Sequence, residues 1–120
     1  MAAPNIVNVA TITAKTVGAA LTTTLTTDIL ANAASSGKVF KVNTIMIANI
    51  DGANAVNVDV DWYDGTNAYK IANTIQVPPD ETLVLTDKNT TIYLEEGHKI
   101  RGGASAASDA NIIISYEEIS

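Results

Sequence analysis

Three aspartates and one histidine are the side chains of this 120-residue chain whose types and spacing could do chemistry. Asp59, Asp61 and Asp64 lie in the segment DVDWYDG, and His98, the single histidine, lies in EEGHK. On an extended strand, Asp59 and Asp61 would share one face about 7 Å apart. That separation suits the paired carboxylates of a glycoside hydrolase, which lie roughly 5 to 9 Å apart. A hydrolase that uses these two carboxylates is therefore one hypothesis.

The competing interpretation makes the same carboxylates the polar side of an amphipathic strand. Apolar residues at the even positions from 56 to 62 alternate with polar residues at the odd positions. This period of two places one strand face on a core and the other in water. We therefore expect Asp59 and Asp61 to be exposed to solvent and to have no catalytic role.

Neither a calcium loop nor a catalytic histidine is expected. An EF-hand loop takes ligands at positions 1, 3, 5 and 12 and needs glycine at position 6, where DVDWYDG has Asp64. Asp64-Gly65 is instead typical of a turn. His98 has no hydroxyl or thiol nucleophile at a known spacing. We expect it to be an exposed turn residue, so no catalytic, cofactor-binding or metal-binding residue is predicted.

Two further segments have residues of the types that bind carbohydrate or phosphate. Trp62 and Tyr63 are adjacent and should point to opposite faces of a strand, whereas a carbohydrate platform needs aromatic rings on one face. Carbohydrate binding stays open as an alternative. The glycine-rich segment 101–105 (RGGAS) lacks the spacing and the strand–loop–helix context of a phosphate-binding loop. We expect it to be a flexible loop or a strand bulge.

Composition excludes several function classes. Thirteen acidic against seven basic residues give a net charge of −6, and the lysines and arginines are scattered, which argues against nucleic-acid binding. The absence of cysteine excludes disulfides and thiol chemistry. No signal peptide and no apolar run of roughly 20 residues is recognisable, so neither secretion nor a membrane span is expected.

The elements that would position these residues are short strands separated by turns. Strands are predicted at 6–17, 21–30, 38–50, 55–64, 68–77, 82–86, 91–95 and 111–117, with Gly18 ending the first and residues 96–98 turning into 99–103. About eight such strands at roughly ten-residue spacing predict one all-β domain over residues 1–120, an antiparallel β-sandwich of jelly-roll type. The third strand should be central, and the threonine-rich second should lie near an edge or an intersubunit surface. The predicted core comprises Phe40, Val42, Val56, Val58, Val60, Trp62, Ile71, Leu83, Leu94, Ile112 and Ile114.

A set of phrases gives the chain a family resemblance. They are IYLEEGHKI at 92–100, VPPDETLV at 77–84, GKVFKVN at 37–43, IANIDG at 47–52 and ISYEEI at 114–119. Together they resemble small virion structural proteins of tailed bacteriophages. The chain departs from the pattern at His98, where the family has an acidic residue after the turn glycine.

The resemblance implies a non-enzymatic virion protein without cofactors, made in the host cytoplasm. Such a protein would be a capsid decoration (cement) protein that binds and stabilises the assembled head, and it would be a trimer in contact with the major capsid protein. The alternative is a small tail, baseplate or fibre module that binds other tail proteins or host carbohydrate. No nucleic acid and no membrane is expected as a partner.

Overall fold

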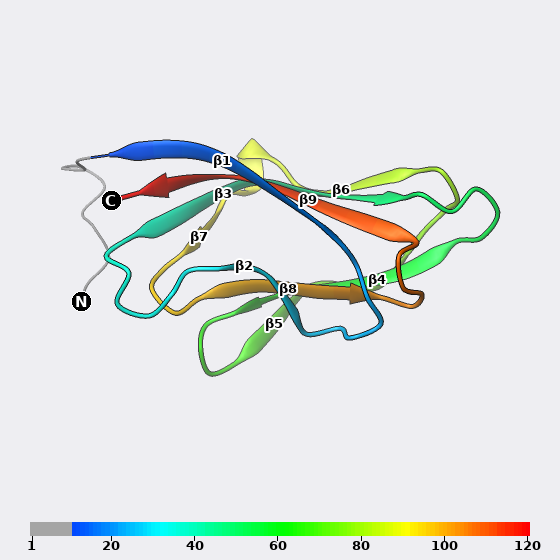
Figure 1. Cartoon of the computed structure of the whole chain (residues 1–120), viewed down its shortest axis with the longest axis horizontal. Coiled ribbons are helices and arrows are strands. Elements are labelled where there is room, and N and C mark those ends of the chain that lie inside the picture. The colour runs from blue at the N-terminus through cyan, green and yellow to red at the C-terminus, as the bar shows by residue number, and fades with distance from the viewer. Residues whose placement is uncertain (1–10) are drawn as a thin grey trace.

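Two antiparallel sheets carry the fold in the computed structural model, which describes residues 11–120 (Figure 1). Sheet A has the order β1 (Ile12–Ala20), β9 (Ala110–Ile119), β3 (Val39–Asn49) and β6 (Thr82–Thr86), and β7 (Ile92–Leu94) pairs with the first half of β3. Sheet B has the order β2 (Thr27–Ala31), β8 (Lys99–Ala104), β4 (Val56–Tyr63) and β5 (Ala68–Val77). A single 3-10 turn, η1 (Lys88–Thr90), separates β6 from β7. Within these residues there is no α-helix, and hence none that could cross a bilayer.

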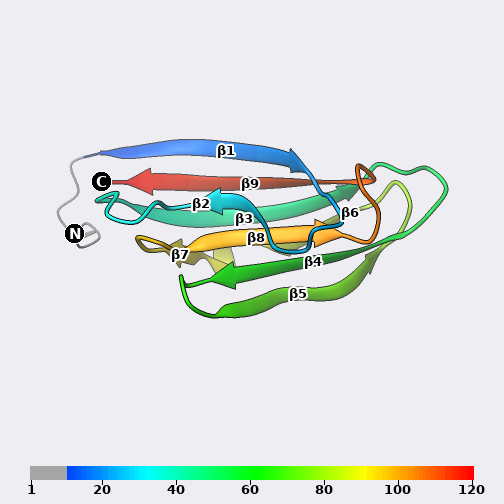
Figure 2. The same ribbon diagram turned by 60° about the horizontal axis from the view of Figure 1, so that its bottom comes forward.

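The strand pairs are nested along the chain. β1 pairs with β9, β2 with β8, β3 with both β6 and β7, and β4 with β5. The chain is therefore one long antiparallel ribbon whose successive strand pairs lie alternately in sheet A and sheet B, and Figure 2 shows the strands of both sheets. The predicted β-sandwich of jelly-roll type is confirmed.

The core lies between the inner faces of the two sheets. Eight of the eleven predicted core residues are buried, and Trp62, Ile71 and Leu83 pack against the core while partly exposed. β3 is central, as predicted, because it pairs on both of its edges. Its isoleucines at 45 and 47 face those of β9 at 112 and 114, and β-branched side chains of this kind pack well on a pleated surface.

Two strand boundaries differ from the prediction, and a third cannot be compared. Gly18 does not end the first strand but pairs with Ile113 inside β1, and the predicted residues 6–10 lie outside the described part of the chain. The second strand begins only at Thr27, although β2 is an edge strand as expected. In the preceding loop, the Thr22 hydroxyl accepts from the Thr24 N–H, and the Thr27 hydroxyl donates to the Thr24 carbonyl. Such local bonds compete with a strand ladder.

The segment 101–105 is neither a flexible loop nor a bulge. Residues 99–104 form β8, which pairs with β4 without a register shift, and Gly102 and Gly103 are buried. Glycine is needed here because two chains approach closely. A Cβ atom on Gly103 would lie 2.5 Å from the Thr24 carbonyl oxygen and 2.7 Å from Leu25 Cα. The loop at 22–26 thus lies directly on the outer face of sheet B at this glycine.

A charged cluster joins three strands at one end of sheet A. The carboxylate of Glu118 on β9 accepts from Lys15 on β1 at 2.6 Å and from Lys38, which directly precedes β3. Hydrogen bonds from Lys15 first and Lys38 second lower the pKa of Glu118, and desolvation opposes them. The same contact raises the pKa of Lys15.

This cluster predicts a pH dependence of stability. A carboxyl whose folded-state pKa is depressed stabilises the fold above its unfolded-state pKa, about 4.3 for glutamate, and loses that contribution as the pH falls through the folded-state value. We expect Glu118→Gln to reduce the free energy of unfolding at pH 7 and to have little effect near pH 3. Urea unfolding of both proteins across this pH range measures the difference.

Glu117→Gln is the matched control, because Glu117 is the neighbouring residue on β9 and its partner Lys41 is 3.7 Å away and about one-third exposed. Such an exposed pair is worth little. Its effect should be small and nearly independent of pH. A Glu118→Gln effect that is equally small at all pH values would contradict the assignment.

Candidate functional site

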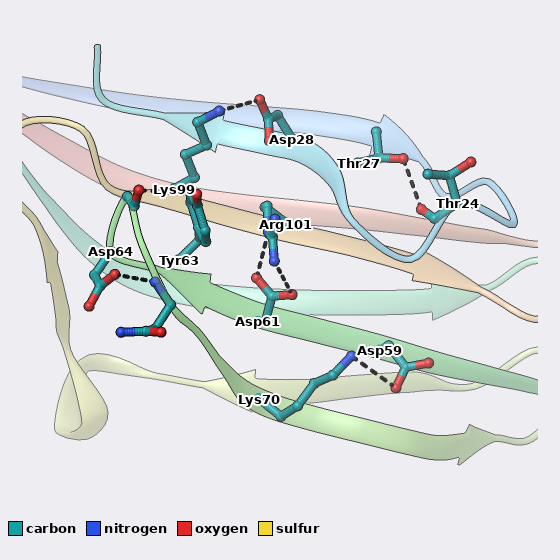
Figure 3. A network of polar contacts seen from close by, with 12 residues as sticks. Thr24, Thr27, Asp28, Asp59, Asp61, Tyr63, Asp64, Lys70, Lys99 and Arg101 are labelled. Carbon is teal, nitrogen blue, oxygen red and sulfur yellow. Dashed lines mark hydrogen bonds and ion pairs between the residues drawn. The ribbon is translucent and has the colours of Figure 1, made fainter. Parts of the chain in front are cut away.

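The aspartates singled out from the sequence lie on the outer face of sheet B and in the turn beside it (Figure 3). The prediction that Asp59 and Asp61 are exposed is wrong, because both are buried and Asp61 is only 1% exposed. Strand alternation does place them on the face away from the core. There, however, cationic side chains from β5 and β8 lie across the sheet and cover them.

Asp61 forms a bidentate ion pair with Arg101. The Arg101 Nε donates to Asp61 Oδ1 at 2.9 Å and its terminal NH2 donates to Oδ2 at 3.1 Å. The two residues are directly opposite each other on β4 and β8. The guanidinium also lies 4.3 Å from the centre of the Tyr63 ring, a cation–π distance. The hydrogen bonds that Arg101 donates to Asp61 raise the pKa of Arg101. Both Asp61 oxygens therefore join β4 to β8.

Asp59 stabilises a bulge in β5. Its Oδ1 accepts from the Thr74 N–H at 2.8 Å, and Lys70 Nζ is 3.6 Å from the same oxygen. Thr74 has φ of 54°, in the left-handed region, and the β4–β5 register shifts beside it. A backbone bulge leaves a ladder N–H unpaired, and the Asp59 carboxylate satisfies it.

Asp64 closes the turn between β4 and β5. Its Oδ1 accepts from the Asn67 N–H at 2.7 Å and from the Thr66 N–H at 2.9 Å. These two bonds, in that order, lower the pKa of Asp64, and the charge of His98 adds to the effect. This is an Asx turn, in which the carboxylate replaces a backbone acceptor, so the predicted turn at Asp64 is confirmed.

The geometry of these residues gives the hydrolase hypothesis no support. Asp59 and Asp61 are each engaged by a separate cation, and no side chain links them into a pair. Two shallow hollows, of about 340 and 360 Å³, lie on sheet A along β1 and β9, and neither is lined by an aspartate or by His98. Among residues 11–120, no three His, Asp or Glu side chains are grouped so that they could hold a metal ion.

His98 is half-buried, contrary to the expectation that it is exposed. It does follow a turn, but its ring lies edge-on to Trp62, with 5.3 Å between ring centres. Trp62 in turn stacks on Tyr69, its cross-strand neighbour on β5, at 5.6 Å. Sequence analysis missed this cluster of three rings. The signal was present, because a four-residue turn at 64–67 places Trp62 opposite Tyr69.

The outer face of sheet A carries many apolar side chains and has no partner within the described structure. Its small or apolar residues are Ile12, Ala14, Gly18, Ala20, Met46, Ala48, Val84, Tyr93 and Ile113, and the polar residues Thr44, Thr82 and Asn111 lie on the same face. Three of them are among the most exposed large hydrophobic side chains of residues 11–120, namely Ile12 (56%), Val84 (54%) and Tyr93 (44%). Lys41 and Glu117 form an ion pair on this face, and Thr16 bonds Ser115.

The two outer faces of the sandwich therefore differ. That of sheet B is covered by its own ion pairs, whereas that of sheet A leaves apolar side chains in water. Contiguous exposed apolar surface marks interaction sites, and one apolar row, Gly18, Ile113, Met46 and Val84, runs across sheet A. No protein-family model matches the chain, and no curated protein matches it either.

Proposed function

We propose that this chain is a non-enzymatic structural subunit of a tailed-bacteriophage particle, a capsid decoration protein that binds and stabilises the assembled head. The observation that carries the proposal is the apolar outer face of sheet A, set against a sheet B face whose charges are already paired. The resemblance to small virion proteins is the reason for proposing a phage particle as the assembly that this face contacts. The engagement of Asp59, Asp61 and Asp64 in local structure favours a role without catalysis.

The phrases that carry the resemblance fall mainly on sheet A. Residues 37–43 and 47–52 include the two ends of β3, residues 77–84 run into β6, residues 92–100 begin with β7, and residues 114–119 lie in β9. These four strands supply most of the outer face of sheet A. The match between the phrases and the apolar face favours that face as the surface through which the subunit assembles.

The face is suited to assembly in many copies. Alanine, glycine and β-branched side chains lose little rotamer freedom when a partner covers them. An interface of standard size buries about 800 Å² on each partner, and apolar burial contributes about 25 cal/mol for each Å². We propose that the subunit forms a trimer, in which three weak contacts with the major capsid protein act together as one strong attachment.

Val84→Asp tests the proposed interface. Val84 is 54% exposed on β6, so a charge there should change the free energy of unfolding by less than about 0.5 kcal/mol. In an assembled interface the same carboxylate would be desolvated without a partner. We expect at least a tenfold loss of binding to purified heads, measured by co-sedimentation, and weaker self-association at micromolar concentration.

Gln76→Asp is the matched control, because Gln76 is exposed on β5 and pairs with Asn57 in sheet B. It adds the same charge to the other side of the sandwich and should leave head binding within about twofold of the original. Equal losses of head binding for the two variants would show that the added charge weakens binding wherever it is placed, which would contradict the proposed interface. Binding to purified tails but not to heads would favour the tail or fibre alternative.

A further inference from the structure

Three loops meet at one end of the sandwich, the end at which the β4–β5 hairpin turns (Figures 1 and 2). They are the segments at 32–38, 64–67 and 95–98. The Asn32 N–H donates to the His98 carbonyl at 2.9 Å, and the Gly37 N–H donates to Glu96 Oε2 at 3.1 Å. The buried Asn32 amide also donates to the carbonyls of Lys38 and Leu94. These bonds hold the segments at 32–38 and 95–98 against each other, so that the residues of both are positioned before any ligand binds.

The rings of Trp62, Tyr69 and His98 lie at this end. Tyr69 stacks on Trp62 with 26° between the ring planes, and His98 meets Trp62 edge-on. Tyr69 is 52% exposed, so part of its aromatic ring is presented to solvent beside Trp62.

Unpaired polar atoms gather at the same end. Among residues 11–120, four buried side-chain polar atoms have no hydrogen-bond partner, and three of them are Trp62 Nε1, His98 Nδ1 and Glu96 Oε1. Buried polar atoms are normally satisfied, so three in one small region call for an explanation. They offer an indole donor, an imidazole nitrogen and a carboxylate acceptor. The Asp64 carboxylate lies close enough for the charge of His98 to influence its pKa, after the larger effects of the Asn67 and Thr66 N–H groups.

We propose that this end of the sandwich binds a carbohydrate through one pyranose ring. The apolar C–H face of the sugar stacks on Tyr69, and its hydroxyl groups bond the polar atoms around the rings. Hydroxyl groups both donate and accept, which suits a set that contains donor and acceptor atoms together. Because the unpaired nitrogens are covered in the free protein, the proposed mode of binding requires Tyr69 to rotate so that a sugar hydroxyl can reach them. The exposed position of Tyr69 on edge strand β5 allows that rotation.

Sugar binding is favoured over binding of an organic cation. A quaternary ammonium ligand needs several ring faces around it, and here Tyr69 covers one face of Trp62 while His98 meets it edge-on. An anion is disfavoured because two carboxylates lie in the loops at this end, Glu96 in the turn before His98 and Asp64 near enough to His98 for that charge to add to the backbone N–H groups that lower the Asp64 pKa. The site lies on the inner side of β4 and β5 at their loop end, apart from the outer face of sheet A. A ligand there would remain accessible in a subunit attached through sheet A.

The test uses Trp62, the only tryptophan of the chain, as its own reporter. The full chain is titrated at millimolar concentrations with a panel of soluble oligosaccharides that contain hexoses, N-acetylhexosamines or deoxyhexoses, and intrinsic fluorescence is followed. We expect a saturable change with at least one of them. Tyr69→Ala should weaken that binding at least tenfold, whereas Tyr69→Phe, which keeps the ring, should stay within about threefold.

Tyr93→Ala is the control, since Tyr93 is comparably exposed on sheet A and should bind within twofold of the original protein. His98→Phe keeps a ring beside Trp62 but removes Nδ1, and we expect it to weaken binding several-fold. The absence of a saturable change with every oligosaccharide would overturn the proposal. So would equal effects of Tyr69→Ala and Tyr93→Ala, or saturable binding of choline chloride without binding of any sugar.

Discussion

Asp61→Ala is expected to lower the free energy of unfolding by about 3–5 kcal/mol, the usual cost of removing one partner from a buried ion pair. The substitution leaves the Arg101 guanidinium, whose side chain is only 16% exposed, without the two carboxylate oxygens that it now contacts at 2.9 and 3.1 Å. Most of the loss arises from this unpaired charge. Chemical denaturation of the two proteins at pH 7 measures it.

A double substitution distinguishes the net contribution of the ion pair from the cost of leaving one of its charges unpaired. Asp61→Leu combined with Arg101→Met removes both charges, and the double variant should recover most of the stability that Asp61→Ala loses. Asp28→Asn is the matched control, because Asp28 bonds Lys99 across β2 and β8 at 2.9 Å but in an exposed position. It should cost less than about 1 kcal/mol. An Asp61→Ala effect as small as this would mean that the pair contributes nothing to the fold.

Gly103→Ala is expected to destabilise the protein by about 1–3 kcal/mol, the usual range for overpacking. The added methyl group would lie 2.5 Å from the Thr24 carbonyl oxygen and 2.7 Å from Leu25 Cα. Both are backbone atoms and cannot rotate away. The loop at 22–26 must therefore lift from the sheet, and we expect faster hydrogen exchange at its amides as well as a lower melting temperature.

Gly18→Ala provides the comparison. A methyl group on Gly18 would meet only the Ile112 carbonyl oxygen, at 3.8 Å, which is an ordinary contact. Alanine also restricts the unfolded chain more than glycine does, so this variant should be neutral or slightly stabilising. Equal destabilisation by the two substitutions would show that the close approach of the loop to Gly103 is not what requires glycine.

Much of the fold could be predicted because strand alternation is a local property. The period of two at 56–62 places the valines of β4 inward, and the turn residues around 64–67 and 78–81 bound β5 as predicted. A hairpin turning at 96–98 into 99–103 was expected, but the second half of β8 was predicted to be a flexible loop or a bulge because its glycines resemble a loop in sequence. Their actual role depends on the segment at 22–26, which packs on them from almost eighty residues away.

The site was harder to predict because burial on a sheet's outer face depends on distant residues. Nothing within DVDWYDG shows that Arg101, forty residues later, covers Asp61, or that the β5 bulge needs Asp59. The contact between Trp62 and Tyr69 could have been predicted, because the turn between β4 and β5 sets the register that pairs these two residues. The position of His98 against them depends on how the β7–β8 turn packs, which one strand pattern does not determine.

Cryo-electron microscopy of a tailed-phage particle assembled with this chain tests directly whether the chain is the proposed decoration protein. We expect density for the chain on the outside of the head. There the outer face of sheet A, with Val84 and Ile12, should be buried against the capsid or a second copy, and the Asp61–Arg101 face should be turned to solvent. A chain whose sheet A face is turned to solvent, or which is absent from the head, would contradict it.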